Sequence, residues 1–132
     1  MTEIIEGMEA VSIHIRDIRK SRTFYSEVLG LKEVHYNEKI SRAAFAIPGT
    51  STVLTMHIQG PGEGGREPGT VSGIAFTNHD PGAACAEIRK RGGTITSEPE
   101  LIKRPGMTMT LAVFADPDGN EFMIRSVPVR TE

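Results

Sequence analysis

The 132-residue sequence predicts an α+β fold made of two tandem copies of one unit, each a strand, a helix and further strands. Three observations predict it. Apolar residues alternate before each of two helix-start signals, and a glycine- and proline-rich stretch separates the two halves. A constant offset of 63 residues also separates Asp17 from Asp80 and Gly30 from Gly93. Because strand, helix start and helix end all keep this offset, it indicates an internal duplication.

The first half begins with a strand over residues 10–15, where small or polar residues alternate with branched apolar ones. Asp17 follows as a helix N-cap, an apolar stripe runs to residue 29, and Gly30 is expected to end the helix. The predicted strands that complete this unit are residues 31–36, 42–47 and 52–58.

The second half repeats this order. A strand is expected over residues 71–77, Asp80 is a second N-cap, Pro81 suits the first helical turn, and Gly92-Gly93 ends the helix. Residues 116–120 (Asp-Pro-Asp-Gly-Asn) predict a tight turn, since proline fixes φ and glycine permits positive φ. The strands expected here are a short one at 94–95 and stronger ones at 107–115 and 121–127.

The domain organisation follows from the stretch of glycine and proline. Such a run sustains neither helix nor strand, so residues 60–70 are predicted to be a linker. The first module then covers about residues 8–59 and the second about 71–127. At this chain length we expect residues 1–132 to form a single domain.

Composition excludes several classes of protein. With 15 Lys+Arg, 17 Asp+Glu and a net charge of −2, nothing favours a nucleic-acid partner. The one cysteine, Cys85, excludes an internal disulfide and a cysteine-based zinc site, and it favours a reducing, cytoplasmic location. No apolar run approaches the ~18 residues that span a bilayer, and the N-terminus is acidic, unlike a signal peptide. We therefore expect no membrane association.

Two motifs resemble the vicinal oxygen chelate superfamily, which includes glyoxalase I, bleomycin-resistance proteins and extradiol dioxygenases. They are residues 13–25 (IHIRDIRKSRTFY) running into 28–31, and residues 114–122 (FADPDGNEF). With the duplication, the resemblance covers about residues 8–127. It implies two βαβββ modules whose curled sheets surround an open cavity, and a homodimer. These motifs are helix caps and turns, so they specify fold more strongly than chemistry.

The resemblance also implies where a metal would bind. Enzymes of this superfamily hold a divalent ion with four side chains, one from the first and one from the last strand of each module. The corresponding residues of this chain are Ala10, Thr55, Gly73 and Met123. Ala and Gly have no donor atom, Thr is a poor ligand, and Met suits soft ions only. The sequence therefore predicts that the family's metal site is absent and that no cofactor is bound.

Alternation along the strands assigns the remaining side chains to two faces. One set is expected beneath the helices: Val11, Ile13, Ile15, Leu54, Met56, Ile58, Phe122 and Ile124. The opposite set is expected to face the cavity: Ala10, Ser12, His14, Val53, Thr55, His57, Glu121, Met123 and Arg125. The predicted ligand-binding residues are Ser12, His14, Phe45, Thr55, His57, Met123 and Arg125.

A parallel first and fourth strand would place His14 and His57 on one wall. His57 corresponds to Arg125 of the second module, so cationic groups would flank a floor of small or soft side chains. This arrangement suits an organic ligand with apolar bulk and a negative or hydrogen-bonding end. Each histidine also has a structural interpretation, as a side chain satisfied by a neighbouring hydroxyl or carbonyl.

Three functions compete. A metal-independent binding protein of the bleomycin-resistance type would sequester a drug or metabolite, although the absence of tryptophan argues against bleomycin itself. A glyoxalase-like lyase or isomerase, or a dioxygenase, would need an atypical site, such as a displaced metal between His14 and His57 with Glu121 as an oxygen donor. A metal-independent enzyme would use His14 or His57 as general acid or base. The sequence leaves open whether any reaction is catalysed and favours binding.

Overall fold

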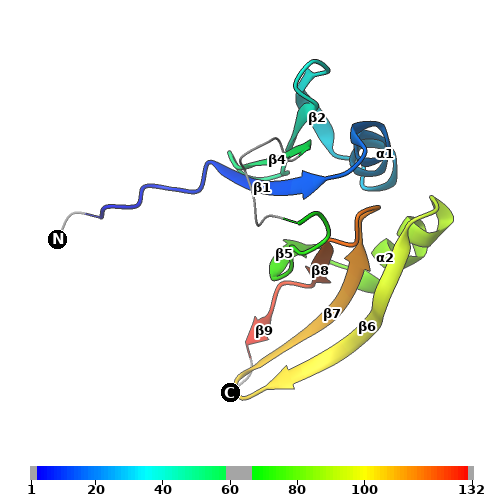
Figure 1. Cartoon of the computed structure of the whole chain (residues 1–132). Coiled ribbons are helices and arrows are strands. Elements are labelled where there is room, and N and C mark those ends of the chain that lie inside the picture. The colour runs from blue at the N-terminus through cyan, green and yellow to red at the C-terminus, as the bar shows by residue number, and fades with distance from the viewer. Residues whose placement is uncertain (1–2, 59–66, 131–132) are drawn as a thin grey trace. The chain divides into compact units, whose positions relative to one another are not determined.

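The computed structural model describes residues 3–58 and 67–130, which belong to two compact units, Met1–Glu67 and Pro68–Glu132 (Figure 1). The boundary between the units falls inside the linker predicted at 60–70, of which residues 60–66 lie outside the described residues. We call the units unit 1 and unit 2 and describe each by itself. Among the described residues, no helix is long and apolar enough to cross a membrane.

Unit 1 is a four-stranded sheet with one interrupted helix. The strands have the order β1-β4-β3-β2, in which β1 and β4 are parallel and the other neighbours are antiparallel. The elements are β1 (Ala10–Ile15), α1 (Ile18–Thr23), the π-helix η1 (Phe24–Val28), β2 (Lys32–Asn37), β3 (Arg42–Ala46) and β4 (Val53–Ile58).

Unit 2 has the same topology, with the order β5-β8-β7-β6 and a parallel pair β5/β8. A short strand, β9, pairs with the start of β7. The elements are β5 (Ile74–Thr77), α2 (Pro81–Lys90), β6 (Thr94–Arg104), β7 (Met107–Ala115), β8 (Glu121–Arg125) and β9 (Val129–Arg130). Two βαβββ units therefore confirm the predicted fold class.

The strands of unit 2 differ from the prediction in length. The strand predicted as residues 94–95 is 11 residues long, because β6 pairs along the whole of β7 from Thr94↔Ala115 to Arg104↔Met107. Pro99 lies where the register shifts between Ser97 and Glu100, a place where a strand tolerates the missing N–H. β5 is shorter than predicted and begins at residue 74, after Gly73 with φ of 87°.

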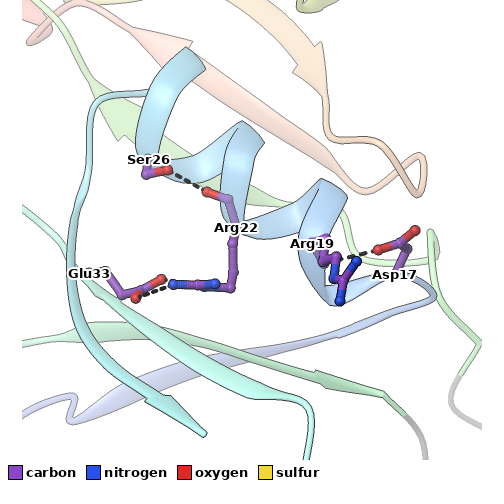
Figure 2. Close-up of polar contacts among 5 residues, drawn as sticks. All are labelled: Asp17, Arg19, Arg22, Ser26 and Glu33. Atoms are coloured by element: carbon purple, nitrogen blue, oxygen red, sulfur yellow. Dashed lines mark hydrogen bonds and ion pairs between the residues drawn. The ribbon is translucent and has the colours of Figure 1, made fainter. Parts of the chain in front are cut away.

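The helix signals behave as predicted. The Asp17 carboxylate accepts from the backbone N–H groups of Arg19 (2.9 Å) and Lys20 (3.2 Å), as Figure 2 shows for Arg19. Asp80 accepts from the N–H of Ala83 at 3.1 Å, and Pro81 is the first residue of α2. These bonds satisfy N–H groups that have no partner inside the helix.

The first helix changes type in its second half. The sequence predicts one helix up to residue 29, whereas the α-helix ends at Thr23 and a π-helix continues to Val28. The N–H of Leu29 bonds the carbonyl of Phe24 at 3.0 Å, which widens the turn by one residue. Gly30, with φ of 72°, then ends the helix as predicted.

The two cores differ in their aromatic packing. In unit 1, Tyr25 lies against Phe45 with ring centroids 5.9 Å apart, and both side chains are fully buried. In unit 2, Phe76, Phe114 and Phe122 form a stacked group with centroids 5.4–6.3 Å apart. Of the predicted core set, Ile13, Ile15, Leu54, Met56, Phe122 and Ile124 are buried, Val11 is half-buried and Ile58 is 39% exposed. Ile58 is the last residue of β4, which explains its exposure.

An ion pair joins the helix of unit 1 to its sheet. The Arg22 guanidinium donates two hydrogen bonds of 2.8 Å to the Glu33 carboxylate and lies 3.5 Å from the centroid of the Tyr36 ring (Figure 2 shows the Arg22–Glu33 pair). This hydrogen bonding lowers the pKa of Glu33 below its usual value, although partial burial opposes the shift. At the 63-residue offset from Arg22, unit 2 has the buried Cys85 instead.

Candidate functional site

In each unit, one side of the sheet packs against the helix and the other side points away from the helix. In unit 1 the helix residue Tyr25 contacts Phe45 of β3, and Phe45 is paired with Leu54 of β4. Residues directly opposite on neighbouring strands point to the same side of a sheet. We call the other side, which carries Ser12 and Thr55, the open face of unit 1.

His14 and His57 lie side by side on this open face. They are directly paired between β1 and β4, and their ring centroids are 4.4 Å apart with the rings inclined by 60°. His14 is 8% exposed and His57 is half-buried. The two strands were predicted to be parallel and adjacent, and the structure brings the two histidines together as that arrangement requires.

Ser12 and Thr55 form the next pair along the same two strands. Their hydroxyl oxygens are 2.7 Å apart and share a hydrogen bond. Thr55 is 8% exposed, whereas Ser12 is exposed. The structure therefore places four of the predicted ligand-binding residues together on unit 1.

Phe45 does not join them. It is fully buried on the helix side of β3, where it packs on Tyr25 and pairs with Leu54. The stretch 42–46 is Arg-Ala-Ala-Phe-Ala, and because alanine suits either face, its alternation does not reveal which side Phe45 occupies. Pairing with β4 decides it, so the placement of Phe45 among the ligand-binding residues is corrected to the core.

The same register brings Arg42 to the open face, which the sequence did not predict. Arg42 is directly opposite His57 and is exposed. Ala44, opposite Thr55, follows on this face and leaves a small side chain beside the hydroxyl pair. The signal that could have found Arg42 is its odd spacing from Phe45, once an aromatic residue in a short strand is assigned to the core.

The two remaining predicted residues lie on β8 of unit 2, on the face opposite the buried Phe122 and Ile124, which we call the open face of unit 2. Met123 pairs with Ala75 and is half-buried, and Arg125 pairs with Thr77 and is exposed. On the same strand as these two, Glu121 accepts a hydrogen bond of 3.2 Å from the Thr96 hydroxyl.

The residues at the family's metal positions do not fit a metal. The Thr55 hydroxyl is hydrogen-bonded to Ser12, and Ala10 has no donor atom. Gly73 has φ of 87°, a conformation that side-chain-bearing residues rarely adopt, so the backbone there disfavours any ligating side chain. Met123 offers only a thioether. Within residues 3–58 and 67–130, no three His, Cys, Asp or Glu side chains gather in a group that could hold a metal ion.

Cys85 is no candidate nucleophile. It is buried in α2, and desolvation raises the pKa of its thiol, although the nearby charge of Arg89 opposes this shift. A thiol needs a lowered pKa to be reactive at neutral pH. Its role is therefore packing.

Known proteins resemble this chain both in sequence and in structure. Two proteins named lactoylglutathione lyase, from Escherichia coli O157:H7 and Shigella flexneri, are each 33% identical to it over 113 residues, 81% of this chain and 82% of theirs. A member of the glyoxalase/bleomycin resistance protein/dioxygenase superfamily from Sphaerobacter thermophilus has a TM-score of 0.82 at 27% identity and covers 95% of this chain and 100% of its own. TnmS3, an antibiotic binding protein from Streptomyces sp. CB03234, has a TM-score of 0.76 at 24% identity, covering 95% of this chain and 98% of that one.

The family itself is identified by sequence. Residues 7–124 match the model of one protein family. That range begins before β1 and ends one residue before the end of β8, so it includes nearly all of both βαβββ units. The resemblance carried by residues 13–25 and 114–122 is confirmed by this match. The chain therefore belongs to the Glyoxalase/Bleomycin resistance protein/Dioxygenase superfamily.

Proposed function

We propose that this protein binds a small organic molecule without a metal ion and sequesters it, as a bleomycin-resistance-like protein would. The carrying observation is that none of the four positions where enzymes of this superfamily are expected to hold a metal has a suitable ligand: Ala10 and Gly73 have no donor atom, Thr55 is a poor ligand and Met123 suits soft ions only. The open faces of the two units supply polar and apolar groups instead, with Ser12, His14, Thr55 and His57 on unit 1 and Met123 and Arg125 on unit 2.

The structural neighbours are consistent with a binding role. TnmS3 is described as an antibiotic binding protein, and it shares this fold. At 24% identity that likeness concerns the fold alone, so it supports binding as a use of this architecture and says nothing about which ligand this chain takes.

A lyase is the second candidate, because both sequence relatives are named lactoylglutathione lyase. Metal-dependent chemistry of the family's kind would need ligands other than the four family positions. A metal-independent reaction would instead use His14 or His57 as general acid or base, since imidazole exchanges protons near neutral pH.

A metal assay followed by native mass spectrometry tests the proposal. Protein purified without added metal should contain far less than one equivalent of zinc, nickel or iron, and native spectra should show retained small molecules. Stoichiometric metal that survives dialysis would contradict metal-independent binding, and turnover of lactoylglutathione would instead establish the lyase. In that case the metal content of His14→Gln and His57→Gln separates the two enzyme mechanisms, because a metal held by these histidines would be lost together with activity, whereas an acid–base role would lose activity alone.

The proposal includes a cytoplasmic homodimer in which residues 1–132 form one domain. The single cysteine supports a reducing compartment, and the resemblance to the superfamily supports the dimer. Light scattering coupled to size exclusion should give twice the 14.4 kDa chain mass. A mass of one chain at micromolar concentration would contradict the dimer.

A further inference from the structure

The open face of unit 1 carries basic side chains and no acidic one among its strand residues. The pairing of the strands shows which side chains belong to this face. On β3 they are Arg42, Ala44 and Ala46, which pair with His57, Thr55 and Val53 of β4. On β2 they are Asn37, His35 and Lys32, which pair with the same three residues of β3. The acidic residue of these strands, Glu33, lies on the other side with Arg22. The basic residues on the open face are His14, Lys32, His35, Arg42 and His57. This differs from the chain as a whole, which has a net charge of −2.

Three of these basic residues form one row across the sheet. His14 is opposite His57, and His57 is opposite Arg42, so the row crosses β1, β4 and β3 without interruption. Asn37 of β2 extends the row with an amide. Neighbouring strands are about 4.8 Å apart, so His57 and Arg42 can donate to the same bound group. Arg42 is exposed and His57 is half-buried, whereas His14 is largely covered and supports the His57 ring from beside it.

The opposite end of this face is small and apolar on β1, β4 and β3. Ala10, Val53 and Ala46 lie there, four residues along the strands from the His14 row, and Lys32 of β2 completes their row. At about 3.3 Å per residue, the two rows are roughly 13 Å apart. Between them lies a row of hydroxyl and methyl groups from Ser12, Thr55 and Ala44, which His35 of β2 completes.

We infer that unit 1 binds a small organic anion whose acidic group lies against His57 and Arg42 and whose apolar body extends along the strands toward Ala46 and Val53. This inference deepens the proposed function, on which it rests, by naming the class of ligand. Guanidinium and imidazolium donors form charge-assisted hydrogen bonds with carboxylates, phosphates and sulfonates.

Binding should depend on pH in the direction set by the histidines. Imidazole gains its charge as pH falls through the range of 8 to 5, whereas guanidinium and ammonium groups stay charged. Among the strand residues that the structure describes on this face, the charged side chains are basic, so the positive charge of the face increases as pH falls. Affinity for an anion is therefore higher at pH 6 than at pH 8.5, and binding takes up protons.

Two fluorescent probes that differ in charge test the inference. The anionic probe is 1-anilinonaphthalene-8-sulfonate, and the neutral one is N-phenyl-1-naphthylamine, which has the same rings without the sulfonate. The sulfonate stays ionised throughout the pH range used, so any pH dependence comes from the protein. We expect the anionic probe to bind at least tenfold more tightly than the neutral one at pH 6, and to lose about tenfold in affinity at pH 8.5.

Single substitutions test whether the anionic probe binds at His57 and Arg42. Arg42→Gln removes one exposed charge and should weaken the anionic probe about tenfold while leaving the neutral probe unchanged. His57→Gln should remove most of the pH dependence. Lys90→Gln is the matched control, because it deletes one positive charge from the exposed face of α2 in unit 2 and should change neither probe. Arg42 and Lys90 are both exposed, so these two variants are expected to fold.

The outcomes separate the two proposals. Equal affinity for both probes, unchanged by Arg42→Gln and by pH, would overturn the anion site and leave the binding function in place. An anionic probe weakened equally by Arg42→Gln and Lys90→Gln would also overturn it, because only the overall charge would then matter. No binding of either probe would contradict both the anion site and the proposed binding of organic molecules.

Discussion

Units 1 and 2 have one topology but carry different side chains on their open faces. The row that contains His14, His57 and Arg42 in unit 1 corresponds to Thr77, Arg125 and Leu111 in unit 2. Leu111 is followed across the sheet by Glu100, where unit 1 has Asn37. The second row therefore contains a cation and an acid, whereas the first contains three basic groups and an amide. The two units therefore share the strand order and the helix caps, whereas the side chains of this row differ.

The cores differ as well, and this gives the largest expected effect. Phe122 of unit 2 is fully buried between Phe76 and Phe114, with both centroids 5.4 Å away. The position equivalent to it on β4 is Leu54, which is also fully buried. Phe122→Ala should lower the free energy of unfolding by about 4 kcal/mol and Leu54→Ala by about 3 kcal/mol, because the larger side chain leaves the larger cavity.

Urea denaturation followed by circular dichroism measures both core variants. The conservative variants Phe122→Leu and Leu54→Met keep most of the volume and should each lose less than about 1.5 kcal/mol. Should Leu54→Ala prove the more damaging change, the aromatic stack would not be the main stabilising feature of unit 2.

The turns that precede the last strands give the second comparison. In unit 2, Asn120 is fully buried, donates to the Asp116 carboxylate at 2.9 Å and accepts from the N–H of Val71 at 3.1 Å. In unit 1, the half-buried Thr52 hydroxyl donates to the carbonyl of Met8 at 2.6 Å. Both bonds tie the start of the last strand to the segment before the first strand of the same unit.

Asn120→Ala should cost about 2 kcal/mol, since it leaves the buried Asp116 carboxylate with one donor fewer and the Val71 N–H without its acceptor. Thr52→Ala should cost about 1 kcal/mol or less, because water can replace the hydroxyl at a partly exposed site. Thermal unfolding of both variants tests this order. An equal loss in the two variants would mean that burial of the turn adds nothing to its hydrogen bonds.

Sequence predicted well those features that a few local residues determine. Asp17 and Asp80 as caps, Gly30 as a helix end and the turn at 116–120 all depend on neighbours within about four residues. Alternation in β1 and β4 placed His14 and His57 on the same face, and the strand arrangement that the family resemblance implies placed them side by side.

Features that depend on distant pairing were missed. β6 is long because β7 is long, and nothing in the polar segment 96–104 signals this locally. Phe45 and Arg42 were misassigned or overlooked because β3 contains three alanines, which fit either face and hide the alternation. The π-helix was likewise missed, because no helix-ending residue marks the change of helix type after Thr23.

Gly73 gives a third comparison, with Ala10 at the same position of unit 1. Ala10 lies in a regular strand, whereas Gly73 has φ of 87° and precedes β5. Gly73→Ala should destabilise the protein by about 1 kcal/mol, because alanine is strained at this positive φ. An added Cβ would meet no atom within 4 Å, so a steric clash does not contribute. Gly82→Ala is the control: Gly82 lies in the first turn of α2 without positive φ, and alanine there should be neutral or slightly stabilising.

The smallest expected effect concerns the ion pair that unit 1 has and unit 2 replaces with Cys85. Because the Arg22 guanidinium lowers the pKa of Glu33, this carboxylate stabilises the fold above its usual pKa of 4.5. That contribution is lost as pH falls through the lowered pKa. Wild type should therefore exceed Glu33→Gln in stability by about 0.5–1 kcal/mol at pH 7, and the difference should shrink as pH falls below 4.5.

Urea unfolding at a series of pH values from 7 to 3 measures this difference. Glu87→Gln is the matched control, because Glu87 pairs with Arg91 at 3.1 Å on the surface of α2, where both side chains are more than 40% exposed. Solvent screens that pair, so its removal should change stability by no more than about 0.3 kcal/mol at any pH. A Glu33→Gln variant that behaves like this control would show that the contact of Arg22 with the Tyr36 ring, rather than its bond to Glu33, fixes the helix of unit 1 on its sheet.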